Sequence, residues 1–93
     1  MGFEDAQARL RSAKGSIRCD EVVTILQSLG FIVEPGTKGK HHTYVHCAIE
    51  GIASNFACPH RGGDPVKNNY ITKILSVLRL HENALREFLG ETR

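Results

Sequence analysis

The chain has 93 residues, a hydrophobic fraction of 41% and a formal net charge of +2 at pH 7. This length fits one small domain with a modest core, and so weak a charge does not by itself indicate a nucleic-acid-binding protein. No apolar run approaches the roughly 18 residues of a membrane span, and the first residues lack the basic and apolar blocks of a signal peptide. We therefore expect a cytoplasmic protein with no membrane partner.

The first two predicted helices differ in how clear their apolar patterns are. Residues 5–14 form a short helix that Gly15 ends, and its few apolar residues predict weak anchoring. The next helix covers 18–29, because its apolar residues recur three and four positions apart and form one stripe. This stripe consists of Val22, Ile25, Leu26 and Leu29. Gly30 fits the left-handed position that follows a helix end.

Three strands are expected at 31–34, 41–48 and 52–58. Pro35-Gly36 ends the first strand, and Glu50-Gly51 is a turn signal between the other two. Those two strands are therefore expected to pair as an antiparallel hairpin.

A second strongly patterned helix covers 68–80, and a shorter one follows over 82–89. The apolar side of the short helix consists of Leu85, Phe88 and Leu89. Since the link between the two helices is short, we expect this side to pack on its own domain. The fold class is α+β: helix–strand–strand–strand–helix, with a three-stranded antiparallel sheet, helices on one face and a short extra C-terminal helix.

The chemistry is concentrated around histidines. His41 and His42 open the second strand, and His60 follows the third. Histidine changes charge near neutral pH and suits proton transfer beside a phosphodiester. His41 follows the flexible turn at Gly39 and is the first candidate for a catalytic residue. His42 is the alternative, because successive strand residues face opposite ways and only one of the two can face a given ligand. His46 and His81 are predicted to be surface residues, and Tyr44 to be half-buried in the sheet.

The surroundings of these histidines are basic. Phosphate or substrate contact is expected from Lys38, Gly39, Lys40, His60, Arg61 and Lys67. Nucleases that depend on metal ions use clusters of Asp and Glu, whereas Glu50 and Asp64 are isolated here. The composition thus favours a histidine mechanism with no metal and no cofactor.

The three cysteines are Cys19, Cys47 and Cys58. An odd number in a chain expected to be cytoplasmic argues against a disulfide framework. A zinc site built from His46, Cys47, Cys58 and His60 lacks any Cys-x-x-Cys or His-x3-His spacing. We therefore predict small buried cysteines and no metal.

The motif Gly39-Lys40-His41-His42-Thr43-Tyr44 carries a resemblance to a known family. With the helix stop at Leu29-Gly30-Phe31, Pro59-His60 and the later helix, it is similar to the HicA toxins over residues 18–80. The family usually has Ser where this chain has Lys40. Residues 1–17 and 81–93 would be extensions of a HicA-like domain.

The resemblance implies a fold like that of double-stranded-RNA-binding domains. It also implies a toxin of a type II toxin–antitoxin system, a messenger-RNA endonuclease with a catalytic histidine at His41. The partners would be RNA and a HicB-type antitoxin protein.

Two other interpretations stay open from the residues. One is a non-catalytic RNA- or DNA-binding module on the same fold, since fold does not fix function. The other is an interaction protein whose extensions form an oligomer. The oligomeric state is open in all three interpretations.

Overall fold

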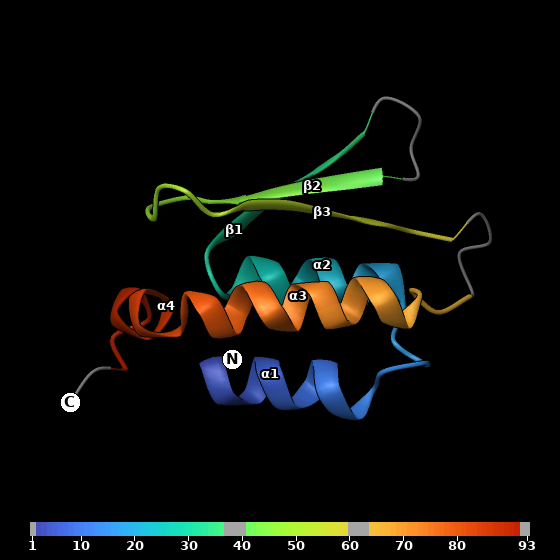
Figure 1. The fold of residues 1–93 in the computed structure, drawn as a ribbon, viewed down its shortest axis with the longest axis horizontal. Coiled ribbons are helices and arrows are strands. Elements are labelled where there is room, and N and C mark those ends of the chain that lie inside the picture. Colours follow the sequence, from blue (N-terminus) through green and yellow to red (C-terminus); the bar gives the residue numbers. More distant parts are fainter. Residues whose placement is uncertain (1, 37–40, 60–63, 92–93) are drawn as a thin grey trace.

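The computed structural model describes residues 2–36, 41–59 and 64–91, which form a sheet on one side of a layer of helices (Figure 1). The strands are β1 (Phe31–Pro35), β2 (His41–His46) and β3 (Ala53–Ala57), antiparallel and in the order β1-β2-β3. Helices α2 (Cys19–Ser28) and α3 (Asn68–Leu80) cover one face of the sheet. The predicted α+β architecture is confirmed.

The two covering helices form where their apolar stripes predict. Helix α2 buries Val22, Ile25 and Leu26, and α3 buries Ile71, Ile74 and Leu78. Gly30 follows α2 with a φ of +94°, as expected for a left-handed helix stop. A Cβ at Gly30 would also lie 2.5 Å from the Phe88 ring, so a side chain has no room there.

Helix α1 (Phe3–Ser12) makes a third layer, packed under α2 and α3 on the side away from the sheet (Figure 1). Phe3, Ala6 and Leu10 have no exposed surface, so the prediction of a weakly anchored helix is wrong. The apolar residues are few, but they lie three and four positions apart on one face. The helix also begins at Phe3, ahead of the predicted start at residue 5.

Helix α4 (Glu82–Phe88) turns back against α1 and α3, and its Leu85 is fully buried. The expectation that this segment packs on its own domain is therefore confirmed. Phe88 remains 43% exposed and lies edge-on against the His46 ring, with the ring centroids 4.6 Å apart.

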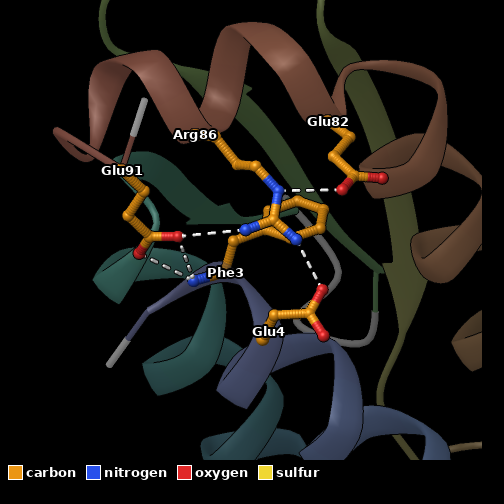
Figure 2. A network of polar contacts seen from close by, with 5 residues as sticks. All are labelled: Phe3, Glu4, Glu82, Arg86 and Glu91. Carbon is orange, nitrogen blue, oxygen red and sulfur yellow. Dashed lines mark hydrogen bonds and ion pairs between the residues drawn. The ribbon is translucent and has the colours of Figure 1, made fainter. Parts of the chain in front are cut away.

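Residues from the start of α1 and from the segment after α4 meet around Arg86 (Figure 2). Its guanidinium forms ion pairs with Glu4, Glu82 and Glu91 and lies 4.8 Å from the centre of the Phe3 ring. Glu91 also accepts a hydrogen bond of 3.1 Å from the backbone N–H of Phe3. This network joins α1 to α4 and to the residues that follow α4.

In the part of the chain that the structure describes, no helix combines the length and the apolar character needed to cross a membrane.

Candidate functional site

One end of the molecule gathers the start of β2, the end of β3 and the N-terminal ends of α2 and α3 (right side of Figure 1). The register of the hairpin pairs His41 with Ala57 and His42 with Phe56. The two candidate catalytic histidines therefore lie beside the end of β3. The predicted contacts at Lys38, Gly39, Lys40, His60 and Arg61 fall outside the described residues.

His41 is exposed and belongs to the face of the sheet that α2 and α3 do not cover. Its backbone carbonyl accepts a hydrogen bond from the N–H of Gly36, the residue after β1. A Cβ at position 36 would lie 2.5 Å from that carbonyl oxygen, so the close approach requires glycine. The Pro35-Gly36 step thus fixes the backbone that carries the His41 ring.

The rest of the uncovered face changes character along the strands. Thr43 of β2 is exposed opposite Glu34 of β1 and Asn55 of β3, which makes the part nearest His41 polar. Further along, the paired residues Ile32 and Val45 are 50% and 42% exposed. The face therefore has a polar end with a histidine and an apolar end.

His42 points the other way, toward the helices, and is half-buried. Its ring stacks on Phe56 with centroids 5.3 Å apart, and its Nδ1 lies 3.4 Å from Cys58 Sγ. The ring lines an open hollow of ≈ 530 Å³ beside the first turns of α2. The other residues of the hollow are Arg18, Cys19, Asp20, Val23 and Thr24. The two adjacent histidines therefore lie on opposite faces of the sheet: His41 on the uncovered face, and His42 in the hollow beside α2.

Cys19 and Cys58 form a disulfide with their Cα atoms 5.5 Å apart, which contradicts the expectation of unpaired cysteines. Cys19 is the first residue of α2 and Cys58 follows β3, so 39 positions separate them in sequence. No local spacing signals such a pair. Cys47 is free and exposed, so the prediction that it is buried is also wrong.

The disulfide and His42 also form a group of metal-ligand atoms that the sequence did not predict. One ring nitrogen of His42 and the sulfurs of Cys19 and Cys58 all lie within 4.8 Å of one another. The zinc site considered from the sequence included His46 and Cys47, which lie at the other end of β2 from His42.

His46 is 7% exposed, so the prediction that it is a surface residue is wrong. Its Nε2 lies 2.9 Å from the carbonyl oxygen of Leu29, and its Nδ1 accepts hydrogen bonds from the N–H groups of Ala48 and Ile49. The ring therefore carries its proton on Nε2, and this N–H donates a hydrogen bond to the carbonyl oxygen of Leu29. His46 joins the end of α2 to the β2–β3 turn.

Tyr44 is fully buried rather than half-buried. Burial raises the pKa of its hydroxyl. That hydroxyl has no hydrogen-bond partner among the described residues. Tyr44 is part of the core and is not placed to stack on a nucleotide base.

The two helix N-termini at this end differ in charge. Helix α2 carries Asp20 and Glu21 in its first turn, whereas α3 has no acidic residue there and is preceded by Lys67. Lys67 is exposed. Because a helix N-terminus attracts anions, the α3 end is the one suited to a phosphate group.

Arg9 of α1 forms an ion pair of 2.5 Å with Glu21 beside a separate hollow of ≈ 270 Å³. The hydrogen bond from Arg9, and then that from the backbone of Arg18, lower the pKa of the Glu21 carboxyl. This hollow is lined by the ion pair, Asp20, Thr24 and Ile25 and contains none of the candidate histidines. We therefore assign it to the packing of α1 on α2.

Comparisons of the chain with protein-family models, with curated proteins and with solved structures find no match.

Proposed function

We propose that the chain is a HicA-type toxin, an RNA endonuclease that cleaves messenger RNA by means of His41 and without a metal ion. The observation that carries the proposal is the position of His41. It is an exposed histidine at the start of β2, on the uncovered face of a sheet that α2 and α3 cover from the other side. The helix–strand–strand–strand–helix order within residues 19–80 is the one that the resemblance implies.

His41 would take the proton from a ribose 2′-hydroxyl, so that the oxygen attacks the adjacent phosphorus, and the 5′-oxygen would take up a proton from water and leave as a hydroxyl group. Histidine suits this step at neutral pH because its unperturbed pKa is about 6.5. An exposed ring on an uncovered sheet is accessible to a single-stranded RNA. The hydrogen bond between Gly36 and the His41 carbonyl supports the role, since it holds the backbone beneath the ring.

Lys67 is proposed to contact the RNA backbone. It is exposed at the N-terminal end of α3, at the same end of the molecule as His41. Contacts with phosphate give affinity without sequence preference. The proposed contacts at Lys38, Gly39, Lys40, His60 and Arg61 rest on the sequence alone.

The same face suits a protein partner. Ile32 and Val45 pair across β1 and β2 and are both largely exposed, which gives an apolar patch beside the polar end that holds His41. Interfaces are apolar at the centre and polar at the rim. A HicB-type antitoxin that covers this patch would also cover His41.

The proposal is tested by the growth of bacteria that express the parent chain or the His41→Ala variant. We expect growth arrest and loss of messenger RNA with the parent, and normal growth with His41→Ala at equal protein level. His81→Ala, at the junction of α3 and α4, is the matched control and should arrest growth like the parent. Arrest by His41→Ala, or growth of cells with the folded parent, would contradict the proposal.

One observation favours a second candidate, a non-catalytic RNA-binding module. Among the described strand residues of the uncovered face, His41 and Glu34 carry the ionisable side chains, and Glu34 lies on β1 opposite Thr43 rather than opposite His41. RNA binding that survives His41→Ala, with no cleavage by the parent, would favour this candidate.

A further inference from the structure

We propose that the reduced chain binds one zinc ion through Cys19, His42 and Cys58, so that the disulfide and the metal site are alternative states of the same side chains. The three residues come from three elements: Cys19 begins α2, His42 lies near the start of β2, and Cys58 follows β3. Their ligand atoms lie within 4.8 Å of one another. This proposal does not depend on the proposed RNA cleavage.

The spacing fits a tetrahedral site with little movement. Zinc bonds of about 2.3 Å to sulfur and 2.0–2.1 Å to nitrogen put two such ligands about 3.5 Å apart at the tetrahedral angle. Nδ1 of His42 lies 3.4 Å from Sγ of Cys58. Once the disulfide is reduced, the two sulfurs need only separate by rotation of their side chains to take up the remaining positions.

The charges of this donor set balance those of the ion. Two thiolates and one neutral imidazole carry two negative charges, which a zinc ion neutralises. Cys19 is the first residue of α2, and the carboxylates of Asp20 and Glu21 in the same turn add negative charge beside the site. Thiolate and imidazole donors together are typical of zinc.

The fourth position opens into the ≈ 530 Å³ hollow beside α2, whose lining includes His42 and Cys19. Three protein ligands with one open position, filled by water, is the arrangement of zinc sites that can accept a further ligand. Asp20 and Thr24 line the same hollow and give it polar side chains. The geometry thus points to a site open to solvent.

The change of state needs a cellular dithiol or thiol as reductant. Two thiol molecules donate two electrons and two protons to the Cys19–Cys58 bond and are joined as a disulfide, leaving two free thiols on the chain. Zinc then binds the two sulfurs and the His42 ring, and two protons leave. Oxidation to the disulfide removes both thiolates and releases the ion.

The test uses the full chain, which is reduced with a phosphine that does not bind metal ions. The phosphine is then removed. Cobalt(II) is added as the probe and later displaced by zinc. We expect about one cobalt per chain, with thiolate-to-cobalt charge-transfer absorption and the intense visible bands of a tetrahedral site. The oxidised parent should bind no cobalt and show no such bands. This control needs no substitution, so no effect of a mutation on folding can explain the result.

Matched substitutions locate the ligands. Cys58→Ser should weaken the charge-transfer band strongly, and His42→Gln should lower zinc affinity by more than the roughly 10–100-fold typical of a residue that only supports a ligand. Cys47→Ser and His41→Gln should bind cobalt like the parent, since Cys47 is exposed elsewhere and His41 faces the opposite side of the sheet. A reduced parent without the thiolate band, equal binding by the oxidised parent, or loss of the band in Cys47→Ser would overturn the proposal.

Discussion

At the scale of single residues, strand β2 places three histidines in three environments. His41 is exposed on the uncovered face, His42 is half-buried beside Cys58, and His46 is in the core. The alternation of the strand separates His41 from His42, as expected for adjacent strand residues. It also puts His46 on the helix side, where its ring bonds to the backbone of Leu29, Ala48 and Ile49.

These environments predict different costs of substitution. We expect His46→Ala to lower the free energy of unfolding by about 2 kcal/mol or more, because the buried carbonyl of Leu29 loses its partner, at about 1–3 kcal/mol, and the part-buried N–H groups of Ala48 and Ile49 lose theirs. His41→Ala should change it by less than about 1 kcal/mol, as is usual for an exposed site. Urea denaturation of both variants measures the difference. Equal stability of the two would mean that the His46 hydrogen bonds do not hold α2 to the β2–β3 turn.

At the scale of elements, the sequence predicted the bounds of all three strands, α2, α3 and α4 to within one residue, apart from the end of β2, which lies two residues before its predicted position. Stripes of apolar residues and the Gly30 and Glu50-Gly51 signals are local, so they can be read from the chain itself. The disulfide could not be, because Cys19 and Cys58 meet only after β3 folds back beside β2. For the candidate site, the sequence predicted that His41 opens β2. The predicted basic contacts, apart from Lys67, fall outside the described residues.

Helix α1 gives a direct test at this scale. Leu10 has no exposed surface, and Leu10→Ala should lower the free energy of unfolding by about 2–5 kcal/mol through the cavity it leaves. Leu80→Ala is the matched control, because Leu80 is 78% exposed and its loss should cost less than about 0.5 kcal/mol. Chemical denaturation compares the two. A Leu10→Ala variant as stable as Leu80→Ala would mean that α1 is not part of the core in solution.

At the scale of the whole molecule, the ion-pair network and the candidate site lie at opposite ends. Helix α4 and the start of α1 lie at one end, where Arg86 forms ion pairs with Glu4 and Glu91 (Figures 1 and 2). His41, His42 and Lys67 lie at the other end, with the N-terminal ends of α2 and α3 (Figure 1). Helix α4, the start of α1 and Glu91 therefore stabilise the fold at the end opposite the proposed catalytic residue.

The central claim is that His41, on the uncovered face, cleaves RNA without a metal ion. It is tested most directly by incubating purified, disulfide-bonded protein with single-stranded RNA in excess EDTA, so that neither an added metal ion nor the Cys19–His42–Cys58 group contributes. We predict cleavage by the parent and by His42→Gln, and none by a folded His41→Gln variant. Cleavage that EDTA abolishes and magnesium or manganese restores, or full activity of His41→Gln, would contradict the account.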